Sequence, residues 1–161
     1  SAGKKRRTLG TELTGPAADV PPLPEGFGPV RVCGSGLVAI GGPKHHGERN
    51  QPDPQMEALA QALAQWPGRE AFPLVVVADD AEFCAQALDN FLWVAFTRSD
   101  PATDVYGARA QTRAKHWSCE APLVMDARLK PFHAPPLEED PDTTRRVDAL
   151  AAPGGPLHGY L

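Results

Sequence analysis

The apolar positions of the chain fall into short β-prone runs and helically spaced stripes that turn residues separate. Two runs, Val30–Cys33 and Gly36–Ile40, flank the pair Gly34-Ser35 and predict a β-hairpin. Pro73–Ala78 is a continuous apolar run that is too short for a helix and rich in valine. Such a run is typical of a strand buried on both faces. We therefore expect it at the centre of a sheet.

The helical stripes have recognisable ends. Asp53 and Pro54 provide an N-cap and a first helical residue, and Pro67-Gly68 ends the stripe that follows. The apolar residues of this first stripe are Met56, Leu59, Ala60, Leu63 and Ala64. A second stripe predicts one continuous, deeply buried helix over residues 83–95, which Arg98–Pro101 closes. Its apolar residues are Phe83, Cys84, Ala87, Leu88, Phe91, Leu92 and Ala95. A last short helix is expected to begin at Asp140-Pro141, with Val147, Leu150 and Ala151 on one side.

A further apolar run, Leu123–Met125, completes a predicted order of β-β-α-β-α-β-α. The connection from the 36–40 strand to the 73–78 strand is a parallel crossover. The fold class is therefore α/β or α+β, a layered sandwich of a mixed sheet with helices packed on it. A length of 161 residues suits one such domain.

The 18 prolines and 15 glycines concentrate at the two ends of the chain. Residues 1–29 are predicted to be a disordered tail and a Pro/Gly-rich linker, because proline lacks the backbone donor and glycine loses the most entropy on ordering. Residues 30–152 would form the domain and residues 153–161 a C-terminal tail. A long unstructured lead into a small domain is what we expect of a chain cut from a longer polypeptide.

The charge balance excludes several classes of partner. A net charge of −4 provides no basic field for nucleic acid or an anionic membrane, and the basic run Lys4–Arg7 is interpreted as a solvated tail. The longest apolar runs fall well short of the ~20 residues that span a bilayer. Three cysteines without CxxC spacing, Cys33, Cys84 and Cys119, disfavour a disulfide framework or a zinc knot and indicate reduced thiols in a cytoplasmic protein.

Asp79 and Asp80 follow the central strand, at the edge where open α/β sheets carry ligands. Two interpretations are open. Paired carboxylates there can hold Mg²⁺, whereas an Asp directly before a helix commonly caps its first N–H groups. We favour the cap.

The other polar clusters carry weaker signals. His45, His46 and Glu48 lack the helical spacing of a paired-histidine metal site and are interpreted as loop residues. His116 and Cys119 are close in sequence, but a buried structural Cys119 is favoured over a nucleophilic pair. The three tryptophans can stack on rings, and Trp93 is expected to pack in the core. The three are Trp66, Trp93 and Trp117. No catalytic, cofactor-binding or metal-binding residue is assigned.

Three motifs nevertheless agree in order and spacing with one family. The first, Val75–Asp80, is similar to a strand ending in "VVDDD". The second, Phe91–Pro101, is similar to a helix reading "vlWalaTRxDP", and the third, Leu123–Pro131, is similar to a later strand reading "iDATxK". This pattern resembles the C-terminal domain of UbiD-type decarboxylases, over about residues 30 to 150. Arg128 stands where the family usually has Thr.

The resemblance implies a role in the non-oxidative decarboxylation of aromatic or α,β-unsaturated acids. It places prenylated FMN, a divalent metal and potassium in a separate catalytic domain, of which this sequence contains no counterpart. The chain would then be the C-terminal assembly and substrate-cleft domain, not catalytic by itself, with a UbiD-type catalytic domain and further copies of itself as partners.

Two alternatives stay open. The first is a stand-alone small subunit of a multi-chain decarboxylase. The second is a small Mg²⁺-dependent phosphoryl-transfer domain that uses Asp79 and Asp80.

Overall fold

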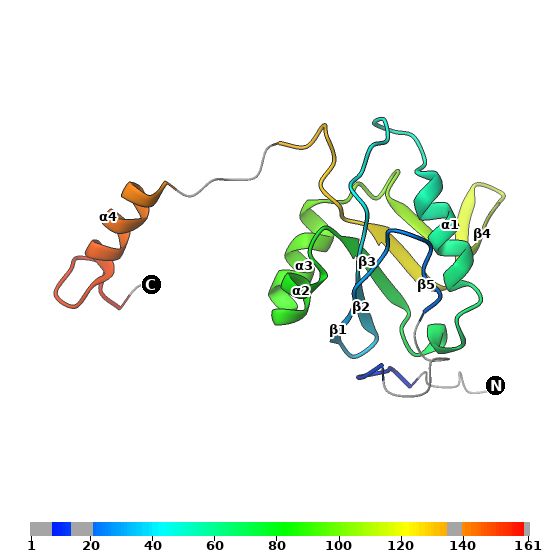
Figure 1. The fold of residues 1–161 in the computed structure, drawn as a ribbon, viewed down its shortest axis with the longest axis horizontal. Helices are drawn as coiled ribbons and strands as arrows, with labels where there is room; N and C mark the ends of the chain where they lie inside the picture. Colours follow the sequence, from blue (N-terminus) through cyan, green and yellow to red (C-terminus); the bar gives the residue numbers. More distant parts are fainter. Residues whose placement is uncertain (1–7, 14–20, 135–139, 160–161) are drawn as a thin grey trace.

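The computed structural model describes residues 8–13, 21–134 and 140–159. Its sheet has five strands in the order β1-β2-β3-β5-β4 (Figure 1). The strands in that order are β1 (Val30–Gly34), β2 (Leu37–Gly41), β3 (Leu74–Ala78), β5 (His116–Asp126) and β4 (Val105–Arg113). β2, β3 and β5 run parallel, whereas β1 and β4 pair antiparallel at the two edges. With helices packed on this mixed sheet, the predicted fold class is confirmed.

The hairpin and the central strand form as the apolar pattern predicts. β1 and β2 join through a tight turn in which Gly36 has a φ of 77°, a conformation that glycine adopts without strain. β3 pairs with β2 on one side and with β5 on the other, and four of its five residues are buried. The crossover from β2 to β3 runs through α1 (Pro54–Leu63), which begins at the predicted Asp53 cap.

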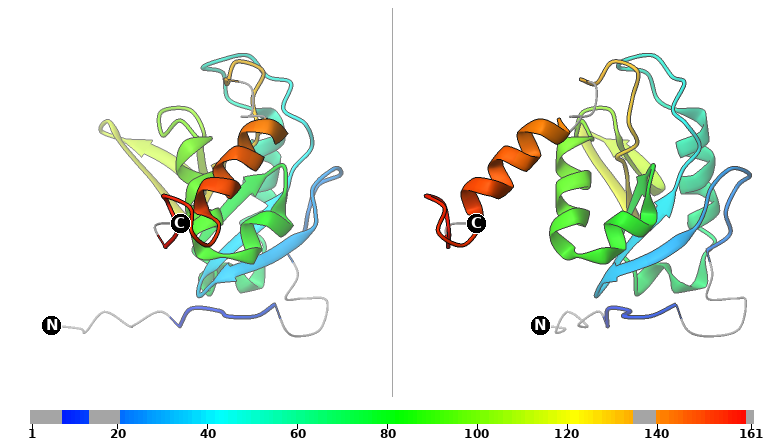
Figure 2. Two further views of the ribbon diagram at one scale, coloured as in Figure 1. Left: turned by 90° about the vertical axis from the view of Figure 1, so that its left-hand side faces the viewer. Right: turned by 60° about the vertical axis from the view of Figure 1, so that its left-hand side comes forward.

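Helices cover both faces of the sheet (Figure 2). Because side chains alternate along a strand, Val75 and Val77 of β3 point toward α1, whereas Val76 points toward α2 (Ala81–Gln86) and α3 (Leu88–Thr97). The result is two apolar cores, one on each face of the sheet.

The prediction of a single helix over residues 83–95 is wrong. The chain forms two helices there, because Ala87 is extended, with φ −154° and ψ 150°. The Nδ2 atom of Asn90 donates a hydrogen bond to the carbonyl oxygen of Phe83 at 3.0 Å, which ties the second helix to the first. The apolar pattern gives no sign of the single extended residue Ala87, because neither glycine nor proline stands at the break.

The apolar pattern also fails to predict β4 and the first half of β5. The outer parts of both strands are exposed, so they lack the apolar alternation that marks a half-buried strand. Ala114 and Lys115, with φ of 48° and 66°, form the turn between them without the glycine that usually marks such a turn. The two strands therefore make a ribbon that extends beyond the rest of the sheet.

The segments at the ends behave differently from each other. Residues 8–13 and 21–29 form neither helix nor strand, yet the Gly10 amide donates to Ala71 at 2.8 Å and the Gly28 amide donates to Gly41 at 2.7 Å. α4 (Pro141–Ala151) begins at the predicted Asp140 cap, but it lies away from the sheet and its residues are almost all exposed (Figures 1 and 2). None of the helices in the described ranges combines the length and apolar character needed to cross a bilayer.

Candidate functional site

A cluster of buried charged and polar side chains lies at the carboxyl end of the parallel strands. Its members come from the loop before α1, from the start of β4, and from the end of β5 with the turn that follows. Each is at most 8% exposed. We call it the carboxyl-edge cluster, and it comprises His45, Asp53, Asp104, Asp126, Arg128 and Lys130.

Arg128 organises the carboxyl-edge cluster. Its Nε and Nη2 donate to the two carboxylate oxygens of Asp126, both at 2.8 Å, in a bidentate pair. Nη2 also donates to Oδ2 of Asp53 at 2.5 Å, and Nη1 donates to the carbonyl oxygen of Pro43 at 3.0 Å. One side chain thus joins the loop before α1, the N-cap of α1 and the end of β5.

Lys130 makes the second set of contacts. Its Nζ donates to the carbonyl oxygens of Asp126 at 2.9 Å and Arg98 at 3.2 Å, and it lies 3.1 Å from Oδ2 of Asp104. The ammonium group therefore connects the end of α3, the start of β4 and the turn after β5. Lys130 is only 3% exposed, and burying an ammonium group is costly unless it has such partners.

The electrostatic balance keeps the central pair ionised. Burial opposes ionisation of Asp126, but the hydrogen bonds from Arg128 and the charge of Lys130 outweigh burial and lower the pKa of that carboxyl group. Burial also opposes the charged form of Arg128, and Asp126 and Asp53 reverse that effect and raise the guanidinium pKa. Both members of the ion pair are therefore charged at neutral pH.

His45 is the member of the cluster whose burial the sequence does not predict. The sequence predicts a loop residue, and the loop is present, but the side chain is only 4% exposed, with Nε2 3.9 Å from Oδ2 of Asp53. Burial lowers its pKa. Its neighbour His46 is exposed, as expected. Nothing local distinguishes the two histidines, because the neighbours of the His45 ring are distant in the chain: Asp53 at the N-cap of α1 and Phe132 in the turn after β5, whose ring centroid is 6.2 Å away.

Asp79 and Asp80 have separate partners. Oδ1 of Asp80 accepts from the Phe83 amide at 2.9 Å, so the predicted helix cap is confirmed for this residue. Asp79 instead accepts from the Leu129 amide at 2.7 Å and pairs with Arg98 at 3.2 Å. The two carboxylates thus fix different segments to the edge of the sheet.

The remaining candidates from the sequence are dispersed. Trp66 is fully buried and stacks on Phe72 with ring centroids 5.4 Å apart. Cys119 is half-buried, so the prediction of a buried cysteine is wrong. His116 and Cys119 are three residues apart on β5, which places them on opposite faces of the strand. Because they lie on opposite faces, the two side chains do not form a nucleophilic pair.

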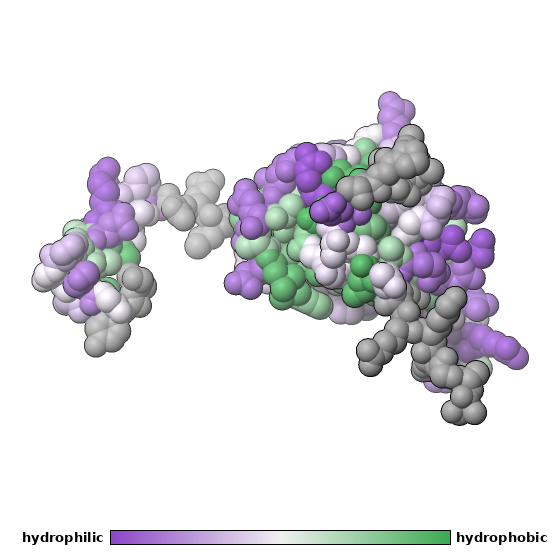
Figure 3. Space-filling model, turned by 90° about the horizontal axis from the view of Figure 1, so that it is seen from below, coloured by the Kyte–Doolittle hydropathy of each residue, from purple (hydrophilic) through white to green (hydrophobic). Residues whose placement is uncertain are grey.

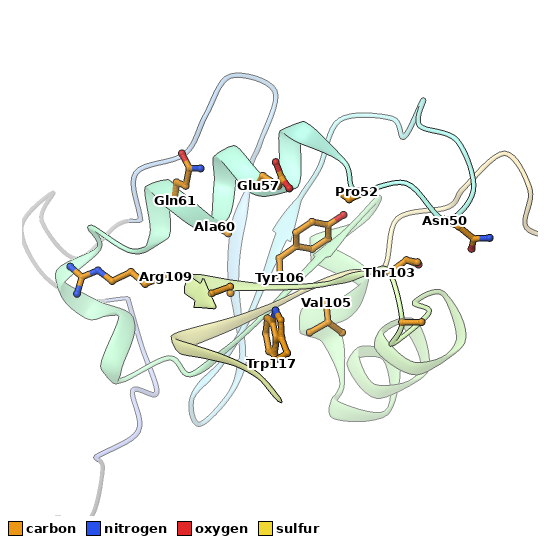
Figure 4. A pocket seen from close by; sticks show the side chains of 13 residues that line it. Asn50, Pro52, Glu57, Ala60, Gln61, Thr103, Val105, Tyr106, Arg109 and Trp117 are labelled. Atoms are coloured by element: carbon orange, nitrogen blue, oxygen red, sulfur yellow. The ribbon is translucent and has the colours of Figure 1, made fainter. Parts of the chain in front are cut away.

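A groove of about 620 Å³ lies between α1 and the β4–β5 ribbon (Figure 4). Glu57 and Gln61 of α1 form one wall, and Tyr106, Arg109 and Trp117 of the ribbon form the other. Trp117 is 45% exposed, which places it on this surface rather than in a core.

An apolar surface on α3 is the most unusual exposed feature. We call it the α3 apolar face, and it comprises Leu88, Leu92, Trp93 and Phe96, which are 50%, 40%, 53% and 69% exposed. The expectation that Trp93 packs in the core is therefore wrong. Trp93 contacts the edge of Phe83 and lies beneath the Arg98 guanidinium, 5.2 Å from the ring centroid. The space-filling view shows apolar side chains gathered on the side that carries α2 and α3 (Figure 3).

The fold and these surfaces define an α+β domain, a mixed sheet with helices packed on it, whose carboxyl edge carries buried charged side chains and whose helix α3 exposes apolar ones. One subunit of a 4-hydroxybenzoate decarboxylase of Chlamydia pneumoniae is 31% identical to this chain over 87 residues. The match spans 54% of this chain and 15% of that protein. Uncharacterised proteins of Chlamydia muridarum and Chlamydia trachomatis are each 31% identical, over 80 and 88 residues, and are matched over 14% and 15% of their lengths.

No family model matches the chain, and no solved structure matches it. The chain thus corresponds to a small part of much longer relatives, one of which is a decarboxylase subunit.

Proposed function

We propose that the chain is the C-terminal assembly and substrate-cleft domain of a UbiD-type decarboxylase and does not catalyse the reaction by itself. The observation that carries this proposal is the α3 apolar face. The similarity to a decarboxylase subunit over half of the chain supports the choice of enzyme class. The substrate class, aromatic or α,β-unsaturated acids, comes from the same resemblance.

The α3 apolar face has the chemistry of a protein interface. Its four side chains occupy positions i, i+4, i+5 and i+8 of α3, so they share one side of the helix. Two of them are aromatic, and aromatic residues are enriched in the centre of interfaces, where arginine is also common. Arg98, stacked on Trp93 and paired with Asp79, forms a polar margin beside this surface. Contiguous apolar exposure of this kind marks interaction sites.

The filled carboxyl edge supports placing the cofactor in a different domain. Nucleotide cofactors of open α/β sheets commonly bind at that edge. Here Arg128 and Lys130 are buried at that edge, and acidic side chains and a backbone carbonyl of the described residues already engage both cations. Prenylated FMN, its divalent metal and potassium would therefore belong to the catalytic domain, in the same or a separate chain. The unpaired cysteines are consistent with a cytoplasmic enzyme.

The experiment mixes this chain with a separately produced UbiD-type catalytic domain from the same source. We expect the two to elute together in size-exclusion chromatography. The double variant Leu92→Asp/Phe96→Asp should abolish co-elution while keeping the circular dichroism of the wild type, because both side chains are exposed. The matched control is Glu57→Lys, an exposed change on the opposite face of the sheet. Equal co-elution of the double variant and the wild type would contradict the proposal.

The stand-alone small subunit is distinguished by the source of the catalytic domain. If the partner is a separately encoded chain, native purification from the source organism recovers the two polypeptides as distinct bands. If both belong to one polypeptide, this chain is recovered only as part of a larger protein.

A further inference from the structure

The C-terminal helix α4 lies outside both cores of the domain. Every residue from Pro141 to Leu150 is exposed, and none of them belongs to either core. A helix of 11 residues is marginal in water by itself, even with an N-cap such as Asp140. Helices in proteins gain most of their stability by packing an apolar side on another element. α4 therefore needs a surface on which to pack.

α4 carries a narrow apolar stripe. Val147 and Leu150 are three residues apart, which places them on one side of the helix, and both are exposed. The chain turns back after the helix, where the Leu157 amide donates to the carbonyl oxygen of Leu150 at 3.0 Å, and the Leu157 side chain is exposed as well. Arg146, four residues before Leu150, lies at the margin of the stripe. α4 is thus an amphipathic helix with a small apolar side and a cation beside it.

The groove between α1 and the β4–β5 ribbon has a lining that suits such a helix (Figure 4). Ala60, Tyr106 and Trp117 supply apolar surface in it. Amphipathic helices bind by laying apolar side chains at helical spacing into grooves of this kind. Glu57 is exposed on the α1 wall, and neither Glu57 nor Arg146 has an ion-pair partner among the described residues. The free carboxylate of the groove and the free cation of α4 are therefore complementary.

The position of α4 favours the groove of a second copy over its own. α4 lies on the side of the domain that carries α2 and α3, whereas the groove lies on the side that carries α1 (Figures 1 and 2). We propose that α4 of one copy docks in this groove of a second copy, so that two chains exchange their C-terminal helices. Two-fold symmetry then makes the same contact twice in each dimer. The exchange leaves the α3 apolar face free and does not depend on the enzyme class proposed above.

The test is the mass of the full chain in solution, measured over a dilution series by size-exclusion chromatography with multi-angle light scattering. The wild type should be a dimer. Leu150→Asp in the stripe of α4 and Trp117→Thr in the groove should each weaken dimerisation about tenfold or more, because each removes an apolar anchor of the contact. Threonine at position 117 keeps the β-propensity of the strand. A wild type that is monomeric throughout would overturn the proposal.

Mixing the two variants tests the exchange itself. Leu150→Asp keeps an intact groove and Trp117→Thr keeps an intact α4, so a mixed pair can still form one of the two contacts. The mixture should form heterodimers at a concentration at which each variant alone is monomeric. A mixture as monomeric as the separate variants would contradict the exchange.

Two controls should dimerise like the wild type. Ala149→Asp adds the same charge on the side of α4 that faces away from Val147, so it tests whether an aspartate merely unfolds the helix. Leu92→Asp/Phe96→Asp alters the α3 apolar face, whose contact with the catalytic domain is measured separately by co-elution. Equal weakening by Ala149→Asp and Leu150→Asp, or a monomeric Leu92→Asp/Phe96→Asp beside a dimeric Leu150→Asp, would show that the stripe of α4 does not join the copies.

Discussion

Phe91 and Trp93 are two residues apart on α3 and face opposite ways. Phe91 is fully buried against the sheet, whereas Trp93 is 53% exposed. Two residues of an α-helix are separated by about 200° around its axis, so only one of the pair can face the core. The side of α3 that faces the sheet carries Phe91, Val94 and Ala95, so Trp93 lies on the outer side of the helix.

This arrangement predicts contrasting effects of two alanine substitutions. Phe91→Ala should lower the free energy of unfolding by about 3–5 kcal/mol, because it leaves a cavity in the core. Trp93→Ala should lower it by only about 1 kcal/mol or less, since it removes contacts with Phe83 and Arg98 at the surface. Urea denaturation of both variants measures the difference. Similar losses for the two would mean that Trp93 is covered in the isolated chain.

A second prediction concerns the buried pair of Asp53 and Arg128. Asp53→Ala should lower the free energy of unfolding by about 3–5 kcal/mol, because it leaves a buried guanidinium short of one partner. It also removes the cap at the Gln55 amide, which is 2.8 Å from Oδ1 of Asp53. Urea denaturation gives the value.

Two further variants apportion the loss in Asp53→Ala. Asp53→Asn keeps an oxygen for the cap and loses the charge, so it should fall between Asp53→Ala and the wild type. Glu82→Gln, which removes the charge of an exposed pair with Arg31, should change stability little. An Asp53→Ala protein as stable as Glu82→Gln would contradict the structural role of the cluster.

The apolar pattern predicts the inner part of the fold well, for a physical reason. The residues of β3 and of the buried side of α1 must be apolar because they are buried. Burial therefore leaves a visible pattern in the sequence, a valine-rich run for β3 and helically spaced apolar residues for α1. The β4–β5 ribbon is exposed, so its pairing depends on backbone hydrogen bonds that the side-chain pattern does not encode. The same applies to the extended Ala87.

The carboxyl-edge cluster is only partly visible in the sequence. Asp53 is recognisable as a helix cap, and Asp126 and Arg128 are recognisable as polar residues at the end of an apolar run. The contact between Asp53 and Arg128 depends on the packing of segments 75 residues apart in the chain, which no local pattern records. His45 escapes recognition for the same reason. The one available signal is an acidic residue and an arginine two positions apart at the end of a buried strand.

A third prediction uses the thiol of Cys33. Burial and the neighbouring Cys84 raise the pKa of Cys33 to about 11. At pH 8 the native chain should therefore carry about one hundredth of the thiolate that an unperturbed cysteine, with a pKa of 9.0, would carry at this position. Alkylation of Cys33 by iodoacetamide, followed in the wild-type chain by mass spectrometry of the peptide that contains Cys33, should speed up about tenfold per pH unit to beyond pH 10. A plateau in the rate near pH 9 would contradict the raised pKa.

The last prediction is a pH dependence of stability that originates at His45. Burial lowers the pKa of His45 in the folded chain, whereas the unfolded chain keeps the ordinary histidine value of 6.5. Below about pH 6.5 the unfolded state therefore binds a proton that the folded state does not, and the folded state loses stability as the pH falls.

The charged and titratable groups around the ring are Asp53, Asp126, Arg128, Lys130 and His133. Because the pKa of His133 is also lowered, His45→Gln should reduce the stability loss between pH 7 and pH 5 without abolishing it. Urea denaturation at each pH measures the loss, and His46→Ala is the matched control that should retain the wild-type dependence. A His45→Gln protein with the full wild-type dependence would show that the proton is taken up elsewhere.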